Sequence, residues 1–305
     1  NTTVRGVHLT FDNFGEYLQN VNPVYLKIAF LFIIIGFGAK IGLFPMHTVG
    51  IDAKSVAPSP IAALMSTVLA NAGFVALFRV WKAIAYTPIH YFANNILILT
   101  GILSLIIAAG YMLKATHTKR ILAYSTLEHM GIVTIALGIG GYAYYALFLH
   151  IVLHSFLKAG LFYQIGQAYK GLGTHEVKES GNYFKIFPLG AILLLIGVLL
   201  ITAIPPSGMF ITELNIFKQI ALNGNWTILI IMIILLCSII YGLITRVLYI
   251  NFLKPVIEIN NVPKQEINKS ETITQILLYT LIIIACFYQP DALKNIINEI
   301  IKSLP

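Results

Sequence analysis

Long apolar runs recur along the chain, separated by short polar loops or by proline-containing breaks. A helix rises about 1.5 Å per residue, so it needs about 20 apolar residues to cross the hydrocarbon core of a bilayer. About nine apolar segments are present, the seventh of them short: residues 24–44, 61–80, 92–113, 121–137, 142–169, 186–204, 210–222, 226–252 and 273–287. This pattern predicts an all-α polytopic membrane protein.

Prolines break the apolar pattern at two places of similar design. Pro45 follows the first segment, which contains Lys40, and Pro205-Pro206 separates the sixth segment from the seventh, which contains Glu213. Proline removes a backbone donor and clashes with the preceding turn. Broken helices at membrane depth are buried in protein or line a cavity, and paired breaks indicate inverted repeats around an ion site.

Three ionisable residues, His150, His154 and Lys158, lie inside the fifth segment at four-residue spacing. Four-residue steps keep side chains on one face of a helix, and this row climbs about 12 Å along the axis. A charge at bilayer depth costs at least about 2.5 to 3.5 kcal/mol, so such residues usually serve a proton or ion route. The alternatives are polar contacts between helices and a metal site, for which the sequence offers no third ligand at suitable spacing.

Further ionisable residues lie inside the segments or beside the breaks. Glu128 and His129 occupy the middle of the fourth segment, where they either carry protons or form a structural pair. Lys40 and Glu213 are candidates for the same route. The alternative for Lys40 is that its side chain extends to the membrane interface, and the alternative for Glu213 is that it caps a helix N-terminus. His47, directly after the first break, favours a site inside the protein.

Composition narrows the class of protein further. Hydrophobic residues make up 58% of the chain and charged residues 10%, and the net charge of +8 is spread among loops. A nucleic-acid partner is therefore not expected. Cys237 and Cys286 have no second thiol or histidine nearby, so the sequence predicts no iron–sulfur cluster, no structural zinc and no other cofactor.

Several motifs resemble those of the antiporter-like membrane subunits of respiratory complex I and related hydrogenases. They are GAKIGLFPMHT at residues 38–48, APSPIAAL at 57–64, KRILAYST at 119–126, HIVLHSFLKAGLF at 150–162 and IPPSGMFITE at 204–213. Within this family, LEHMG at residues 127–131 is most similar to the hydrogenase-4 component F branch.

The resemblance implies a fold of about fourteen helices with two inverted five-helix repeats, each containing a broken helix. This chain would hold the end of the first repeat and all of the second, and the essential glutamate of the first repeat would lie before Asn1. The resemblance also assigns roles: Lys40 is the lysine of the first repeat, Lys158 is the central lysine of the second with His150 and His154 as its relay, and Glu213 is the terminal site.

Three residues are assigned supporting roles: His47, Ser66 and Arg246. Some relatives carry a histidine where this chain has Ser66, so water or the Glu128/His129 pair is expected to link the two halves of the route. Arg246 lies near the end of the eighth segment, where reaching the interface is its alternative role.

The chain is thus expected to contain a polar inter-helix segment (1–23), an antiporter-like transmembrane domain (24–253), and a loop, last membrane helix and amphipathic tail (254–305). Its expected function is proton or sodium translocation, without a redox centre of its own, in a hydrogenase or NADH-dehydrogenase-like complex. Its partners would be the lipid bilayer, other membrane-arm subunits and a peripheral hydrogenase or dehydrogenase module, in the cytoplasmic membrane of a bacterium or archaeon. The alternatives are a stand-alone cation/proton antiporter and a structural spacer of the membrane arm.

Overall fold

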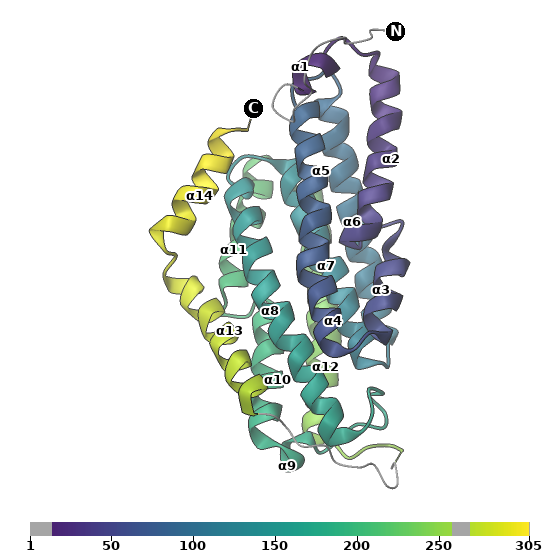
Figure 1. Cartoon of the computed structure of the whole chain (residues 1–305), viewed down its shortest axis with the longest axis vertical. Helices are drawn as coiled ribbons and strands as arrows, with labels where there is room; N and C mark the ends of the chain where they lie inside the picture. The colour runs from purple at the N-terminus through teal and green to yellow at the C-terminus, as the bar shows by residue number, and fades with distance from the viewer. Residues whose placement is uncertain (1–13, 258–268, 305) are drawn as a thin grey trace.

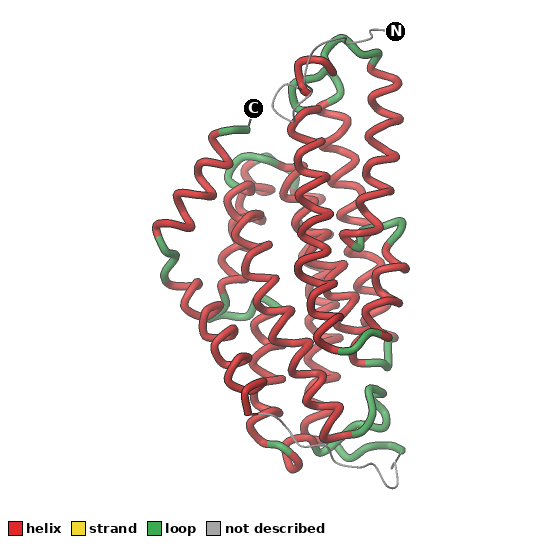
Figure 2. Tube along the Cα trace, viewed as in Figure 1, coloured by secondary structure: helices red, strands yellow, loops and turns green. Residues whose placement is uncertain are grey.

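The computed structural model of the chain describes residues 14–257 and 269–304, which form a bundle of helices (Figure 1, Figure 2). In chain order the helices are α1 (Phe14–Leu18), α2 (Pro23–Ile41), α3 (His47–Val56), α4 (Ser59–Leu64), α5 (Ala70–Ile84), α6 (His90–Lys114), α7 (Thr118–Ile139), α8 (Ala143–Leu172), α9 (Tyr183–Ile186), α10 (Pro188–Ile201), α11 (Gly208–Leu222), α12 (Trp226–Phe252), α13 (Lys269–Phe287) and α14 (Asp291–Lys302). A π-helical stretch, Met65–Leu69, joins α4 to α5. Figure 1 shows α13 and α14 at one edge of the bundle and α2 and α3 at the opposite edge.

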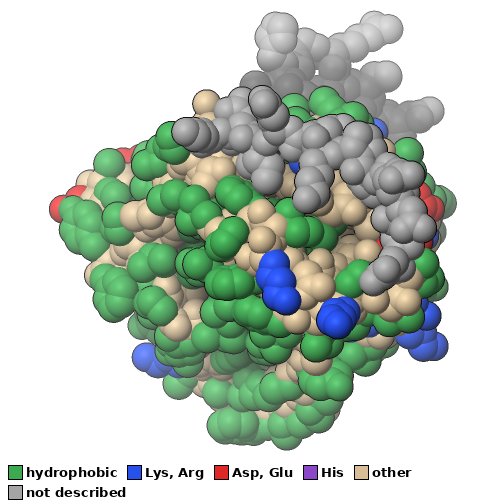
Figure 3. Space-filling view, turned by 90° about the horizontal axis from the view of Figure 1, so that it is seen from below, with side chains coloured by type: hydrophobic (Ala, Val, Ile, Leu, Met, Phe, Trp, Pro, Cys, Tyr) green, Lys and Arg blue, Asp and Glu red, His purple; other side chains and the backbone are tan. Residues whose placement is uncertain are grey.

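Seven helical stretches within the described ranges are long and apolar enough to cross a membrane: 23–41, 59–84, 90–114, 118–139, 143–172, 226–252 and 270–287. Large apolar side chains are exposed along the outer helices, for example Ile234 on α12 and Phe32 on α2. In the space-filling view of Figure 3, hydrophobic side chains cover most of the visible surface and lysines and arginines stand as separate spots. The prediction of an all-α polytopic membrane protein is confirmed.

Both predicted breaks are present, and a serine side chain contacts the backbone at each. Between α2 and α3, the Phe44 amide donates a hydrogen bond of 3.0 Å to the Ser104 hydroxyl of α6. Between α10 and α11, the Ser207 hydroxyl donates to the Leu200 carbonyl at 2.8 Å and accepts from the Met209 amide at 3.2 Å. Backbone polar groups inside a membrane need partners within the protein, and these serines supply some of them.

Helix α7 lies at the centre of the bundle and is buried at every position from Ile121 to Gly138. Close packing against α6 depends on two glycines. A Cβ atom on Gly101 would lie 2.7 Å from the Gly131 carbonyl oxygen, and one on Gly131 would lie 3.0 Å from the Gly101 carbonyl oxygen. Small residues allow membrane helices to approach this closely, because lipid provides no hydrophobic force between them.

The loop after α8 packs against the start of α7. The Thr118 amide donates to the His175 carbonyl at 2.8 Å, and the Val177 amide donates to the Thr116 carbonyl at 2.8 Å. The His175 ring stacks on Tyr169 of α8 with centroids 4.4 Å apart. Burial, followed by the nearby charges of Lys119 and His117, lowers the pKa of His175 to about 3.

Parts of the two ends of the chain lie within the described residues. Residues 14–18 of the expected 1–23 segment form α1, and residues 1–13 lie outside the described ranges. After α12, residues 258–268 are also outside them, and α13 and the predicted amphipathic helix α14 follow. Helix α14 buries Ile297 and is oblique to the bundle in Figure 1.

The contact between α6 and α7 can be tested by adding side-chain volume. We expect Gly131→Val to lower the stability of the purified protein by about 1 to 3 kcal/mol, because its side chain would meet the backbone of α6. Gly110→Val on α6 is the matched control, since a Cβ there meets nothing within 4 Å. Thermal unfolding in detergent measures both, and equal midpoints for the two variants would contradict the proposed packing.

The acid sensitivity of the loop can be tested at His175. An unfolded histidine binds a proton near pH 6.5, whereas the folded His175 does so only near 3, so stability falls as pH drops below about 6.5. His175→Phe keeps a ring on Tyr169 and removes the titrating group. We expect the variant to lose less thermal stability than the wild type between about pH 7.5 and 5.5. An identical loss in both proteins would argue against this assignment.

Candidate functional site

The predicted row on α8 is fully buried and faces α7. His150, His154 and Lys158 each have no exposed surface. The Lys158 ammonium donates to the Leu122 carbonyl oxygen at 2.8 Å and also to the Ser125 hydroxyl, both on α7. A lysine held by neutral oxygen acceptors can lose or regain its proton without breaking an ion pair, which suits it to carrying protons.

His150 connects three helices. Its Nδ1 lies 2.9 Å from the Thr212 hydroxyl of α11, and its Nε2 lies 3.2 Å from Nδ1 of His129 on α7. The Thr212 hydroxyl donates its own hydrogen to the Met209 carbonyl at 2.7 Å, so its oxygen accepts from the Nδ1–H of His150. This network assigns the neutral tautomer of His150 whose Nε2 lone pair faces His129.

Glu213 reaches the same cluster from α11, which begins at the second break. Its Oε1 lies 4.0 Å from Nδ1 of His129, and its side chain keeps 10% of its surface exposed. One ligand atom each from His129, His150 and Glu213 lies within 4.8 Å of the other two, so these residues could hold a metal ion. The spacing of residues along α8 offered no third ligand. The fold brings His129 from α7 and Glu213 from α11 to His150 of α8.

Two neighbouring groups lack hydrogen-bond partners among the described residues. Both ring nitrogens of His154 are unpaired, and its ring centroid lies 5.0 Å from that of His129. Oε2 of Glu128 is buried and unpaired, and the charge of Glu128 interacts with those of Glu213 and Lys158. Buried polar atoms without partners are costly, so they mark a place where water, protons or an ion can bind.

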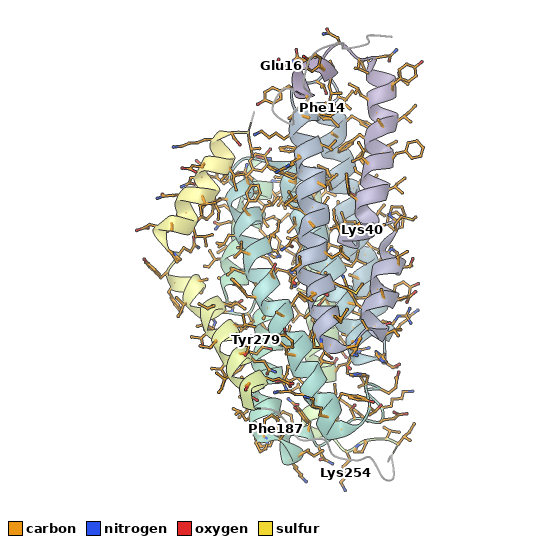
Figure 4. The ribbon with its side chains drawn as sticks, viewed as in Figure 1. Phe14, Glu16, Lys40, Phe187, Lys254 and Tyr279 are labelled. Atoms are coloured by element: carbon orange, nitrogen blue, oxygen red, sulfur yellow. The ribbon has the colours of Figure 1, made fainter. Side chains whose placement is uncertain are left out.

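The first break places its two lysines differently. Lys40 is exposed at the end of α2, where Figure 4 labels it near the junction with α3. Lys54 on α3 is only 3% exposed, and its charge interacts with Lys158 and His154. A Cβ atom on Gly42, in the break itself, would lie 3.9 Å from the Lys54 ammonium nitrogen. The described residues therefore connect Lys54, and not Lys40, to the buried cluster.

The three supporting residues occupy distinct places. His47 begins α3 and is 7% exposed, beside the first break. Ser66 lies fully buried in the π-helical stretch, with its hydroxyl unpaired. π-Helical turns often mark functional positions. The Arg246 guanidinium donates to the carbonyls of Leu113, Ala115 and Gly242, so it caps the end of α6 and joins it to α12.

Sequence comparison identifies the family. A family model described as "NADH:quinone oxidoreductase/Mrp antiporter, TM" matches residues 3–240. The chain belongs to this family. A hydrogenase-4 component F homolog from Methylacidiphilum infernorum (isolate V4) is 33% identical over 212 residues, covering 69% of this chain and 44% of that protein. Hydrogenase-4 component B of Escherichia coli (strain K12) is 33% identical over 208 residues, covering 64% and 31%.

Solved structures show the same fold. The membrane-bound sulfane sulfur reductase, an archaeal respiratory membrane complex, contains a chain that matches with a TM-score of 0.83 and 22% identity, over 97% of this chain and 59% of that one. Respiratory complex I from Thermus thermophilus matches with a TM-score of 0.71 and 20% identity, over 90% and 63%. The expected family and antiporter-like fold are confirmed, and the chain spans less than half the length of the two relatives named above.

Reasoning from the sequence did not identify three residues that contact or surround the buried cluster. Lys54 lies in a short polar stretch that looked like an interruption, although it forms part of a helix. Thr212 and Ser125 are ordinary small polar residues in apolar segments, and only their contacts with His150 and Lys158 distinguish them. For Lys54 a signal was available: it lies in the same polar stretch as His47, seven residues further along the chain.

Proposed function

We propose that this chain belongs to an ion-translocating membrane subunit of a respiratory complex, in which protons move through the buried cluster between α3, α7, α8 and α11. The observation that carries this proposal is a set of buried ionisable side chains from four helices, in mutual electrostatic or hydrogen-bonding reach: Lys54, Glu128, His129, His150, His154, Lys158 and Glu213. Ionisable groups are rare at membrane depth and mark ion or proton routes.

The proposed route enters at the C-terminal end of α3, where α4 begins. A cavity of ≈ 620 Å³ is lined by Ser55, Pro58, His117 and Lys119, among others, and Ser55 is the immediate neighbour of Lys54. Water in this cavity would exchange protons with Lys54. Because Lys54 and Lys158 repel each other when both are charged, a proton arriving on one favours release from the other.

From Lys158 the route continues through the histidines to Glu213. His154 lies beside His129, and the Nδ1–H of His129 can be donated to Nε2 of His150. Glu213, 4.0 Å from His129 and slightly exposed, would release the proton on the far side of the second break. Glu128 would balance the positive charge that passes between these groups.

The proposed coupling follows from the field around these charges. A redox reaction in partner subunits would change the charge beside the cluster and shift protons along it, so the chain needs no redox group of its own. The same geometry could take sodium at the carboxylates, which prefer hard cations. Lys40 is exposed at the end of α2. Its role in proton transfer remains a prediction and concerns the part of the route that a longer protein would add.

We also propose the partner subunits and the membrane of this subunit. Its relatives are named as hydrogenase-4 components, and its structural neighbours come from respiratory membrane complexes. Its partners would be other membrane-arm subunits and a peripheral hydrogenase or dehydrogenase module, in the cytoplasmic membrane of a bacterium or archaeon. Purification of the full-length protein with its partners, read for a nickel–iron hydrogenase or a dehydrogenase, tests this proposal.

The central lysine provides the decisive test. We expect Lys158→Met in the full-length complex to reduce ion translocation below about a tenth of the wild-type rate, equivalent to about 1.4 kcal/mol of barrier, with redox chemistry and assembly retained. Translocation is measured with a pH-sensitive dye in reconstituted vesicles while the redox reaction is followed in parallel. Lys294→Met on α14 is the control, because Lys294 pairs with Asp291 at the surface and lies outside both the cavity and the buried cluster.

Unchanged translocation in Lys158→Met would support the structural-spacer alternative. Wild-type translocation that needs no redox partner would support the stand-alone antiporter.

A second variant tests the entry of the route. We expect Lys54→Met to lower translocation to below about a tenth of the wild-type rate, because it removes the link between the cavity and Lys158. The comparison variant is Lys54→Arg, which keeps a charge but cannot release its proton. If both variants pump normally, Lys54 is no part of the route, and if only Lys54→Arg does, a fixed charge is sufficient there.

A further inference from the structure

Three ligand atoms from three helices converge at the centre of the bundle. Nδ1 of His129 lies 3.2 Å from Nε2 of His150 and 4.0 Å from Oε1 of Glu213. One ligand atom of each of the three buried residues lies within 4.8 Å of the other two. Two imidazoles and one carboxylate are a common ligand set for zinc in proteins, with a fourth position open to water or another ligand.

The distances suit a small four-coordinate cation. Zinc–nitrogen bonds of about 2.0 to 2.1 Å place tetrahedral ligand atoms about 3.3 Å apart. The two imidazole nitrogens are already 3.2 Å apart. Glu213 lies 4.0 Å from His129, so its carboxylate must approach by roughly 1 Å, and its long flexible side chain allows this.

The surrounding contacts orient one ligand in advance. Thr212 accepts the Nδ1–H of His150, which fixes the ring and leaves the Nε2 lone pair directed at His129. Zinc-binding histidines typically donate their other ring N–H to such an outer partner. His154 has both ring nitrogens unpaired and lies 5.0 Å from the His129 ring, so it is available as a fourth ligand.

We propose that His129, His150 and Glu213 form a binding site for a divalent transition-metal cation of the zinc class, completed by His154 or water. Access is from the side of Glu213, whose side chain is 10% exposed while that of His129 is fully buried. Imidazole nitrogen favours zinc, copper and nickel over calcium or magnesium.

A bound cation would have a consequence for transport. It would occupy the Nδ1 of His129 and the Nε2 of His150, the two atoms between which the proposed route passes a proton. Zinc is therefore expected to block translocation. This consequence rests on the proposed function, whereas the binding of the metal does not.

The binding test uses Co²⁺ as a spectroscopic substitute for zinc, added to the purified full-length protein in detergent. Four-coordinate Co²⁺ absorbs visible light much more strongly than six-coordinate Co²⁺. We expect one equivalent of Co²⁺ to give the intense absorption and Zn²⁺ to abolish it by displacement. His129→Gln and Glu213→Gln should lose the absorption, and His90→Gln, at a histidine outside the cluster, should keep it.

Thr212→Val keeps all three ligands and removes only the partner of His150. We expect it to bind Co²⁺ about 10- to 100-fold more weakly, the usual effect of losing an outer partner. If a variant of one of the ligands fails to fold, the Co²⁺ affinity of Thr212→Val still tests the site. The absence of intense absorption in the wild type would overturn the proposal. So would a Co²⁺ affinity that is unchanged in both Glu213→Gln and Thr212→Val.

A parallel assay measures Zn²⁺ inhibition of translocation in the reconstituted complex. Co²⁺ binding at the cluster without inhibition would leave the metal site in place and contradict the proposed proton route. Thr212→Val keeps every titrating group of the route and should need about 10- to 100-fold more Zn²⁺ for inhibition. Inhibition at the wild-type Zn²⁺ concentration in Thr212→Val, together with unchanged Co²⁺ binding there, would overturn the metal site and leave the proton route untouched.

Discussion

The structure depends on the burial of α7 from Ile121 to Gly138. This helix carries Glu128 and His129, and a membrane helix with such residues is tolerable only if other helices separate it from lipid. The glycine contact with α6 brings one neighbour within backbone distance, and α8 covers another side with its own row of ionisable residues. Because α7 is enclosed in this way, polar groups that would be expensive in lipid face one another instead.

The two breaks allow additional chain segments to reach this enclosed region. A continuous helix would carry its residues past this region, whereas α11 begins beside the histidines and α3 begins at the first break. The second break places Thr212 and Glu213 beside the histidines, and the first places Lys54 beside the lysine of α8. Ser104 and Ser207 bind backbone groups that the breaks release, which lowers the cost of interrupting a helix in lipid.

The histidines of the cluster could take part in proton transfer or in metal binding, because they make few hydrogen bonds to the surrounding protein. His150 is oriented by Thr212, but His154 has no partner among the described residues and Glu128 has a free oxygen. The same lone pairs can pass protons or hold a metal ion, and the chemistry differs only in what reaches them. Arg246 contrasts with these residues. Its guanidinium contacts three backbone carbonyls, which gives it a structural role at the joint between α6 and α12.

Much of the fold followed from the sequence alone, because a membrane helix satisfies its backbone internally and must be apolar over a fixed length. The segment predicted at 226–252 matches α12 to the residue, and both breaks lie where prolines predicted them. The row on α8 was also predictable, since helical geometry fixes which residues share a face. Contacts between helices were not, because they depend on how the bundle packs. Only the tertiary structure brought Glu213, Thr212 and His129 to His150 and buried Lys54 while leaving Lys40 exposed.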